Sequence, residues 1–458
     1  MASGGAEKAD VVVVGMGPGG EDLAGSLAQS GLKVVGIERK LVGGECPYWG
    51  CVPSKMMIRA ANLLADGRRV RGMAGSSEVQ PDWAPVAQRI RLEATDNWDD
   101  KVAVDRFVSK GGEFVRGTGR LLGSGRVGVA GREFVARRGI VLNVGTSAVI
   151  PPIPGLAEVP YWTNRQAIET ETLPHSLIVL GGGAIGLELA QVFARFGVRV
   201  SVIEAMARLL PTEEPEAGQL LAQILGTEAI DLRIGCRAVA IEKQHDEIAV
   251  NLESGDRLVA NKLLVAVGRR ANLSDLGLQQ AGVALDDGFI GVDEHMRAGI
   301  GIWAVGDATG HGAFTHVSMY QAHIATADIL GQPHEPANYR AVPRVTFTDP
   351  EVGTVGLTEK AARDRGIVVR TGIGNQASSA RGWIHKVGNQ GFIKLVEDAD
   401  RGVLVGATAM SPVGGEILSM LTLAIHAQIP TNQLRSMIYA YPTFHRGVED
   451  ALAALGAS

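Results

Sequence analysis

The stretch Asp10–Glu38, DVVVVGMGPGGEDLAGSLAQSGLKVVGIE, decides the fold. Its apolar start predicts a buried strand that runs into a glycine-rich turn, after which residues 21–29 predict a helix and residues 33–38 a second strand. A strand, a glycine turn, a helix and a strand ending in an acid are typical of a dinucleotide-binding unit. The pyrophosphate lies at the helix N-terminus, and the acid accepts a hydrogen bond from a ribose hydroxyl. A turn without a ligand is the simpler alternative, but every condition of context is met. The predicted binding residues are Gly15, Gly17, Gly20 and Glu38.

The same pattern returns at Ser176–Glu204, SLIVLGGGAIGLELAQVFARFGVRVSVIE. Two such units predict two dinucleotides, one FAD and one nicotinamide cofactor. Glu204 ends the second ribose-binding strand, where a carboxylate repels a 2′-phosphate and favours NAD(H) over NADP(H). Arg208 stands nearby and is the feature that would admit NADP(H), because a guanidinium can recruit that phosphate. The predicted nicotinamide-site residues are Gly181, Gly183, Gly186 and Glu204.

Gly43–Lys55, GGECPYWGCVPSK, holds two of the three cysteines of the 458-residue chain. In a cytosolic protein such a pair indicates redox or metal chemistry, and metal is the weaker choice because the third cysteine, Cys236, lies far away. The glycine turn predicts a helix with Cys46 at its N-terminus, where the exposed amides favour a thiolate. Lys55 follows Cys51 at i+4 and faces the same way. A structural disulfide or two unrelated core thiols are the alternatives.

Composition sets further bounds. The net charge of −5, without a basic stripe, excludes nucleic acid as an expected partner. The 60 glycines and only 5% aromatic residues indicate many tight turns that approach ligands. The N-terminal MASGGAEKAD lacks the features of a signal peptide and no apolar run reaches membrane-spanning length, so we expect a cytoplasmic protein of two or three domains, with no membrane partner and no metal.

The motif Gly-Gly-x-Cys-x4-Cys-Val-Pro-Ser-Lys resembles the signature of the two-cysteine pyridine nucleotide–disulfide oxidoreductases, and the resemblance runs from Val11 to Leu452. It implies an α/β fold with two Rossmann-like doubly wound nucleotide-binding domains and an α+β C-terminal dimerisation domain. It also implies that electrons pass from nicotinamide through FAD to a redox-active Cys46–Cys51 disulfide, with Cys51 beside the flavin and Cys46 exchanging with substrate. The expected domains are FAD-binding 1–149 and 270–337, NAD(P)-binding 150–269, and dimerisation 338–458.

The resemblance also assigns roles to single residues. Glu188, which we expect in the first turn of its helix, would pair with Lys55 beside the flavin; compensation of the helix dipole is the alternative. Asp307, in GIWAVGDATG, would hold the FAD ribityl chain, and a structural cap is the competing account. Glu45 should oppose a thiolate at Cys46. Further cofactor-binding positions are Gly44, Lys55, Gly117, Gly145, Gly268, Gly306 and Thr315, the last at the start of a helix over 314–330.

One segment departs from the family pattern before the second nucleotide-binding unit. The family carries an Ala-Thr-Gly-Ser motif there, whereas this chain has Asn143-Val144-Gly145-Thr146. The turn is still expected, but side-chain contacts from it are expected to be weak.

The C-terminal segment departs further. Family disulfide reductases carry a His-Pro-Thr motif followed by a glutamate, and their histidine shuttles protons for the thiol substrate. Here Tyr441 stands for the histidine and Arg446 for the glutamate, and a tyrosine is a poor base at neutral pH. A helix from Thr443 onward would place His445 and Glu449 one turn apart, as an exposed ion pair or as a shifted base.

The acceptor therefore stays open among several classes. A small-molecule disulfide, as in dihydrolipoamide dehydrogenases, is one; a quinone and a second pyridine nucleotide are others. Mercuric ion is less favoured because the chain ends in ALAALGAS rather than a cysteine pair. A flavin- and NAD-binding redox sensor, or a structural subunit of a larger complex, is the non-enzymatic alternative. We expect a homodimer in which the C-terminal segment of one subunit completes the site of the other, although an apolar helix such as 416–427 could equally be ordinary core.

Overall fold

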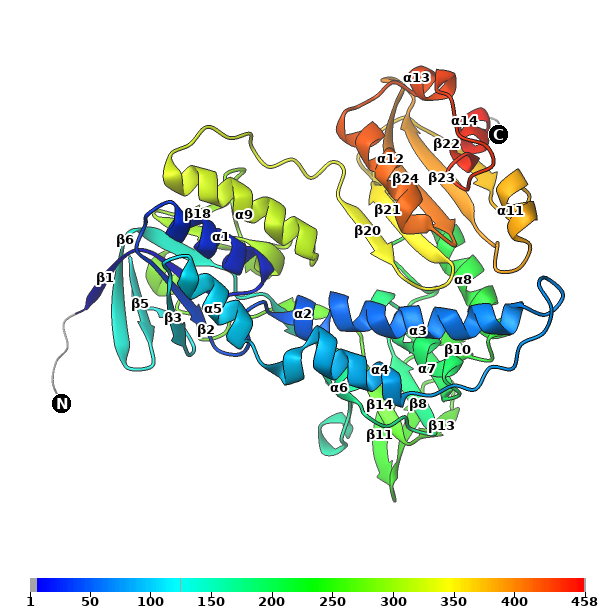
Figure 1. Ribbon diagram of the computed structural model, residues 1–458, viewed down its shortest axis with the longest axis horizontal. Coiled ribbons are helices and arrows are strands. Elements are labelled where there is room, and N and C mark those ends of the chain that lie inside the picture. Colours follow the sequence, from blue (N-terminus) through cyan, green and yellow to red (C-terminus); the bar gives the residue numbers. More distant parts are fainter. Residues whose placement is uncertain (1–5, 124, 457–458) are drawn as a thin grey trace. The chain divides into compact units, whose positions relative to one another are not determined.

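The computed structural model describes residues 6–123 and 125–456, and the chain divides into two compact units (Figure 1). The first contains the described residues of Met1–Ser54, Gln88–Val149 and Arg269–Asn338. The second contains those of Lys55–Ala87, Ile150–Gly268 and Tyr339–Ser458. Within the described residues, no helix combines the length and apolar character needed to cross a bilayer. The three-domain boundaries expected from the sequence stay a prediction.

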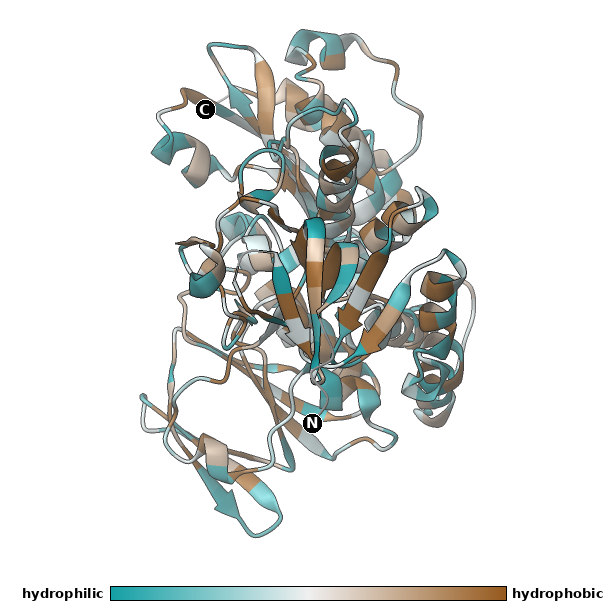
Figure 2. Ribbon diagram, turned by 90° about the vertical axis from the view of Figure 1, so that its left-hand side faces the viewer, coloured by the Kyte–Doolittle hydropathy of each residue, from teal (hydrophilic) through white to brown (hydrophobic). Residues whose placement is uncertain are grey.

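The first unit is built on a sheet in the order β18-β19-β6-β1-β2-β3. Neighbours from β19 to β3 pair in parallel, and β18 closes the edge antiparallel to β19. Val11 to Val14 are all buried, and Val12 and Val14 pack in one core with Leu121 and Val127. Figure 2 shows brown over much of these strands. The strands are β1 (Glu7–Val14), β2 (Val34–Glu38), β3 (Glu113–Arg116), β6 (Arg132–Leu142), β18 (Arg297–Gly299) and β19 (Ile302–Ala304), with the hairpin β4 (Arg120–Leu121) and β5 (Arg126–Val129) added to β6.

Two helices of the first unit lie side by side. α1 (Pro18–Gln29) packs against α9 (Thr315–Leu330) so closely that a Cβ on Gly19 would stand 2.3 Å from Ser318 Oγ. Glycine is needed at position 19 because the two helices lie too close for a side chain there, not because the backbone has a positive φ. The remaining elements are α2 (Glu45–Trp49), α5 (Lys101–Ser109), β7 (Thr146–Ala148), β15 (Arg269–Ala271), β16 (Leu285–Asp286), β17 (Phe289–Ile290) and the 3-10 helix η5 (Gly306–Thr309).

The second unit begins with a parallel sheet in the order β10-β9-β8-β14, joined to a three-stranded antiparallel sheet. Its strands are β8 (Ser176–Leu180), β9 (Arg199–Glu204), β10 (Asp231–Ile234), β14 (Lys262–Val265), β11 (Ala238–Gln244), β12 (Glu247–Leu252) and β13 (Arg257–Ala260). Its helices are α4 (Ala84–Arg89), α6 (Asn164–Glu169), α7 (Ala184–Arg195) and α8 (Pro215–Thr227), and the long α3 (Cys51–Arg69) leads into this unit.

The C-terminal part of the second unit is a five-stranded antiparallel sheet in the order β20-β21-β24-β23-β22, with α12 against β21 and β24 and α14 against β22 (Figure 1). The elements are β20 (Pro343–Thr346), β21 (Glu351–Gly356), β22 (Val369–Asn375), β23 (Phe392–Asp398), β24 (Val403–Ser411), α10 (Glu359–Asp364), α11 (Ala380–His385), α12 (Gly414–His426), α13 (Thr431–Ser436) and α14 (Gly447–Ala453). The core of this part gathers the buried faces of β23, β24 and α12. The architecture is the α/β fold with Rossmann-type sheets and an antiparallel C-terminal sheet that the sequence predicts.

Candidate active site

The first glycine turn is shaped by close backbone approaches. Gly15 has φ +94°, and a Cβ there would stand 2.2 Å from the Asn143 carbonyl oxygen; a Cβ on Gly20 would stand 2.2 Å from the Gly15 carbonyl oxygen. Gly17 precedes α1 and provides no side-chain cap. The N-terminus of α1 is therefore narrow and glycine-lined, the form that admits a pyrophosphate.

Glu38 is held in place by the backbone that surrounds it. Its Oε2 accepts from Met16 N at 2.9 Å and its Oε1 from Lys40 N at 2.7 Å. Each carboxylate oxygen can accept a second hydrogen bond, so Glu38 keeps capacity for a ribose hydroxyl.

The second glycine turn repeats these contacts. Gly181 has φ +108°, and a Cβ built there would stand 2.4 Å from the Ala266 carbonyl oxygen. A Cβ built on Gly186 would stand 2.1 Å from the Gly181 carbonyl oxygen. Glu204 Oε2 accepts from Gly182 N and Oε1 from Met206 N, both at 2.6 Å. A Cβ on Gly183 would meet nothing within 4 Å, so this turn opens toward a ligand.

Arg208 does not extend toward the Glu204 carboxylate. Its guanidinium donates to three backbone carbonyls of the following loop, those of Leu210, Pro211 and Glu213, at 3.1, 2.7 and 2.8 Å. From the sequence, Arg208 is the residue that could bind a 2′-phosphate. In the structure its guanidinium instead forms hydrogen bonds within the loop 208–213.

The cysteine pair follows the Gly43–Gly44 turn, in which a Cβ on Gly44 would stand 2.9 Å from Gly17 Cα. The expected redox helix is interrupted: α2 ends at Trp49, Gly50 adopts φ −134° and ψ −120°, and α3 starts at Cys51. The two cysteines are not joined in a disulfide; Cys46 is half-buried and Cys51 is exposed. The two residues that matter for a disulfide therefore stand on either side of a break.

The surroundings of Cys46 favour the protonated form of its thiol. The hydrogen bond to Cys51 and partial burial raise the pKa of the Cys46 thiol, while Thr315 opposes that rise. This direction differs from the expected thiolate at Cys46, because α2 has only five residues and the neighbouring sulfur outweighs its dipole. Glu45, which the sequence predicts to oppose a thiolate at Cys46, has its carboxylate 3.8 Å from Arg269, and its effect on Cys46 stays a prediction. Cys51 Sγ lies 3.5 Å from Thr315 Oγ1, and Thr315 is also a hydrogen-bond partner of Cys46.

Lys55 and Glu188 form an ion pair with Nζ and Oε2 2.9 Å apart. The other oxygen of Glu188 accepts from Phe347 N at 2.8 Å, and the Lys55 ammonium lies 4.6 Å from the Phe347 ring centroid. Because α7 begins at Ala184, Glu188 stands in its second turn and not in the first as expected, so dipole compensation is not its role. Phe347 was not found from the sequence.

Asp307 anchors a cluster of polar groups in η5. Thr146 Oγ1 donates to its carboxylate at 2.7 Å, and Arg269 Nε donates to Thr146 Oγ1 at 2.8 Å. Burial raises the pKa of Asp307, against the lowering by Thr146 and Arg269. Asn143, part of the same departure from the family motif, accepts from Gly20 N at 2.9 Å and donates to the Val305 carbonyl at 3.0 Å. The expectation of weak side-chain contacts from this segment is wrong.

The other glycine positions lie at turns of the first unit or its boundary. Ser318 Oγ is buried without a hydrogen-bond partner among the described residues, 2.7 Å from where a Cβ on Gly306 would stand. Positive φ angles occur at Gly44, Gly117, Gly145, Gly268 and Gly306.

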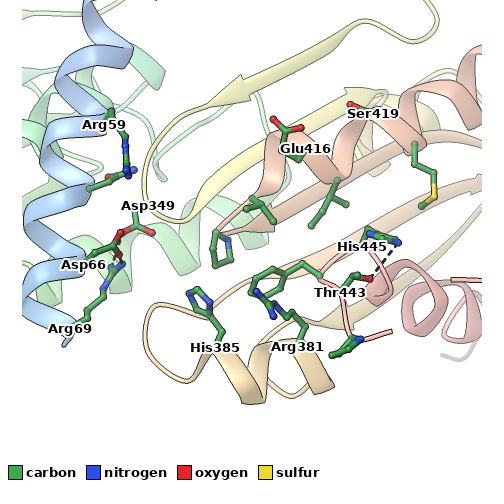
Figure 3. Close-up of a pocket in the computed structure, with 17 residues that line it drawn as sticks. Arg59, Asp66, Arg69, Asp349, Arg381, His385, Glu416, Ser419, Thr443 and His445 are labelled. Atoms are coloured by element: carbon green, nitrogen blue, oxygen red, sulfur yellow. Dashed lines mark hydrogen bonds and ion pairs between the residues drawn. The ribbon is translucent and has the colours of Figure 1, made fainter. Parts of the chain in front are cut away.

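The C-terminal residues lie around a pocket of about 880 Å³ in the second unit (Figure 3). His445 lines it, with Nε2 3.4 Å from Thr443 Oγ1. The predicted His445–Glu449 pair is wrong: α14 begins only at Gly447, and Glu449 instead pairs with Arg446 at 2.9 Å. Tyr441 is 69% exposed, with the Arg446 guanidinium 5.4 Å from its ring centroid.

Arginines gather on the same pocket. Arg59 and Arg69 reach it from α3 and Arg381 from α11, opposite Asp349 and Glu416 (Figure 3). Arg69 forms an ion pair with Asp349, with Nη2 and Oδ2 2.7 Å apart. Burial and two nearby arginines lower the pKa of His385.

Comparisons with known proteins agree with this geometry. Residues 9–327 match the family model "Pyridine nucleotide-disulphide oxidoreductase", and residues 342–452 match its dimerisation domain. A dihydrolipoyl dehydrogenase of Thermus scotoductus is 33% identical and a mercuric reductase of Bacillus cereus 31% identical, each over 97% of this chain and over 97% and 71% of the relative. The HOCl-induced flavoprotein disulfide reductase RclA of Escherichia coli superposes with a TM-score of 0.85 at 26% identity, covering 97% of this chain and 99% of its own.

Proposed function

The chain belongs to the pyridine nucleotide–disulphide oxidoreductase family, whose members use FAD and NAD(P)H, and from that premise we propose that it oxidises NADH and reduces a small acceptor through Cys46 and Cys51. The observation that carries the proposal is the cysteine pair itself: the two side chains interact with each other, and Cys51 contacts Thr315 at the start of α9.

FAD fits the first unit. The glycine turn at Gly15–Gly20, the ribose acceptor Glu38 and the buried acceptor Asp307 supply what an adenine dinucleotide with a polyol chain needs. Ser318 Oγ offers a buried hydroxyl whose hydrogen-bonding capacity is unused among the described residues. When bound, FAD supplies a centre that takes two electrons from a nicotinamide and delivers them to a disulfide.

The second unit is assigned to NADH. Glu204 places a negative charge where NADPH would carry its 2′-phosphate, and the three carbonyl contacts of Arg208 remove the group that would counter it. We assign Lys55 and Glu188 to the same half-reaction, Lys55 as a charge fixed by the Glu188 carboxylate and Phe347 as the positioning residue.

The thiol half-reaction balances as follows for a disulfide acceptor. Two electrons and two protons convert the Cys46–Cys51 disulfide to the dithiol. One sulfur, as thiolate, attacks the acceptor disulfide and releases one thiol; the second sulfur then displaces the other thiol and closes the Cys46–Cys51 bond. When Cys46 is the attacking sulfur it must lose its proton before the first step, and because the pKa of its thiol is raised, that step needs a base.

That requirement favours a second candidate acceptor. Tyr441 is exposed and His445 faces Thr443, while Glu449 pairs with Arg446, so among the described residues 441–456 no His–Glu dyad takes the proton. A quinone or another one- or two-electron acceptor needs no thiol proton shuttle. We propose that such acceptors are reduced faster than lipoamide or glutathione disulfide.

The test is steady-state NADH oxidation by the FAD-loaded protein with a panel of lipoamide, glutathione disulfide, quinones, mercuric ion and thionicotinamide nucleotide. We expect turnover with NADH that requires an added acceptor. An NADH oxidation rate unchanged by every acceptor would favour the sensor alternative. Turnover with a disulfide that persists in Cys46→Ser would refute the role of the pair.

We further propose a homodimer formed through the matched dimerisation domain. Trp383 is 74% exposed and Ile438 95% exposed, beside the pocket-lining segments 381–385 and 442–445. Light scattering should give twice the chain mass. Trp383→Glu together with Ile438→Glu should shift it to one chain mass, whereas the paired surface change Val102→Glu and Val108→Glu on α5 should not.

A further inference from the structure

Three side chains with metal-binding chemistry meet in the first unit, away from the cysteines and the glycine turns. His295 lies in the turn before β18, Asp328 in the last turn of α9, and His334 in the loop after it. One ligand atom from each lies within 4.8 Å of the others. Sequence spacing does not reveal the cluster, because 32 residues separate His295 from Asp328 (328 − 295 − 1 = 32).

The tautomer of His334 leaves a lone pair toward the cluster. Its Nδ1 lies 3.1 Å from the Glu335 carbonyl oxygen, which can only accept, so Nδ1 carries the proton. In the neutral ring Nε2 is then an acceptor, and it faces Asp328 Oδ1 at 3.5 Å. Two acceptors face each other across this gap, an arrangement that calls for a proton or a cation between them.

The spacing suits a metal ion. Two ligands each about 2.1 Å from a tetrahedral ion lie about 3.4 Å apart, close to the separation of His334 Nε2 and Asp328 Oδ1. A protonated His334 would instead draw its hydrogen-bond partner to about 2.8 Å. The donation of Nδ1–H to a carbonyl is also how metal-binding histidines are oriented.

The third ligand is an unsatisfied nitrogen. His295 Nδ1 is buried and has no hydrogen-bond partner among the described residues. The His295 ring stands edge-to-face on the His334 ring, with centroids 5.0 Å apart. A buried ring nitrogen without a partner is costly, and a bound ion removes that cost.

The charge around the cluster favours a cation. The Asp328 side chain is 6% exposed. Its Oδ2 accepts from Arg297 Nε and from Trp303 Nε1, whereas its Oδ1 accepts from Arg297 Nη2 and has room for one further partner on the side that faces His334. Asp293 accepts from the backbone of the same turn, and Glu294 lies 3.8 Å from His295 Nε2, so two further acids lie near the cluster.

We propose that His295, Asp328 and His334 form a site for a divalent transition-metal ion, of which Zn²⁺ fits best. Two imidazoles and one carboxylate are ligands that zinc takes in tetrahedral sites, with water in the fourth position. The ion joins the C-terminal end of α9 to the turn that precedes the edge strand β18. It is structural, and it is separate from the electron path through Cys46 and Cys51.

Zinc binding is measured by calorimetry on FAD-loaded protein in which Cys46, Cys51 and Cys236 are replaced with serine, so that no thiol competes. We expect one Zn²⁺ per chain, and at least tenfold weaker binding in His295→Ala and in His334→Ala. His323→Ala is the matched control, because His323 is also on α9 and pairs with Asp22 at 3.3 Å outside the cluster; its zinc binding should be unchanged.

Thermal unfolding gives a second readout. Zinc should raise the unfolding midpoint of the parent and of His323→Ala, and should leave both cluster variants where they were. If an alanine variant no longer retains FAD, glutamine at the same position replaces it. Zinc affinity equal in the parent and in the His295/His334 double variant would overturn the proposal, and so would a midpoint that zinc raises equally in both.

Discussion

Replacing Arg208 with alanine tests what decides the nucleotide preference. The guanidinium donates to the carbonyls of Leu210, Pro211 and Glu213, so we expect Arg208→Ala to weaken the loop and leave the preference for NADH unchanged. The alternative, in which Arg208 recruits a 2′-phosphate, predicts a selective loss with NADPH.

The magnitudes separate the two accounts. A hydrogen bond from a charged donor contributes about 1.5–3 kcal/mol, but Arg208 is only half-buried and water can reach the freed carbonyls. We therefore expect a loss of about 2 kcal/mol in the free energy of unfolding, summed over three contacts. A lost guanidinium–phosphate contact would instead cost about 1.5 kcal/mol or more with NADPH alone, which is about tenfold in kcat/KM.

The assay compares kcat/KM for NADH and NADPH in the parent, Arg208→Ala, Arg208→Lys and Glu204→Ala. The informative quantity is kcat/KM for NADH divided by kcat/KM for NADPH, because a general loosening of the site lowers both values alike and leaves their ratio unchanged. We expect the ratio to change less than about twofold at position 208 and to fall by about fivefold or more in Glu204→Ala, the scale of one charged contact. A tenfold rise in the ratio for Arg208→Ala would refute the reasoning, since it would mean that Arg208 leaves its carbonyls when NADPH binds.

Three further predictions rest on single contacts. Two-electron reduction should produce a long-wavelength thiolate-to-flavin absorption that Cys51→Ser abolishes and Cys46→Ser retains, because Cys51 is the sulfur expected beside the flavin and the pKa of Cys46 is raised; retention in Cys51→Ser would contradict this. Asp307→Asn should stabilise the apoprotein at neutral pH while weakening FAD binding: burial raises the Asp307 pKa above 3.8, so the folded parent loses stability as pH rises from that value toward the raised one, and thermal melts across pH 4–7 should show the gain shrink toward the acidic end. His445→Ala and Tyr441→Phe should leave quinone reduction within about twofold of the parent, and disulfide reduction that collapses in either variant would identify the missing acid–base group.

The local patterns of the sequence were sufficient for much of the fold. The strand from Asp10, the glycine turn and the strand ending at Glu38 are all encoded within 29 residues (38 − 10 + 1 = 29), and the structure places them as the pattern requires. The same holds for Ser176–Glu204. These units are predictable because steric limits on a glycine turn act over a few residues and need no distant partner.

What the sequence missed depends on distant contacts or on where a helix begins. Asn143 accepts a hydrogen bond from Gly20, 123 residues away in the sequence, and Thr146 donates one to Asp307, 161 residues away. The segment that departs from the family motif is therefore held by distant hydrogen bonds that its own sequence does not reveal. The start of α14 was placed too early, which put His445 on a helix it precedes. Helix starts are poorly fixed by pattern alone, and here an error of four residues created an ion pair that does not exist.

The two glycine turns show why identical fingerprints can serve different cofactors. Glu38 and Glu204 make the same pair of backbone contacts, one to the residue after the first glycine and one two residues beyond the acid. On the assignments that we propose, the acid and its turn would bind the adenosine half common to FAD and NAD and would not distinguish the two cofactors. The difference lies beyond the turn: only in the first unit do Asn143 and Asp307 continue the polar lining from the glycines into η5. A cofactor with a polyol after its pyrophosphate can use that lining, so the assignment of FAD to the first unit follows from residues outside the fingerprint.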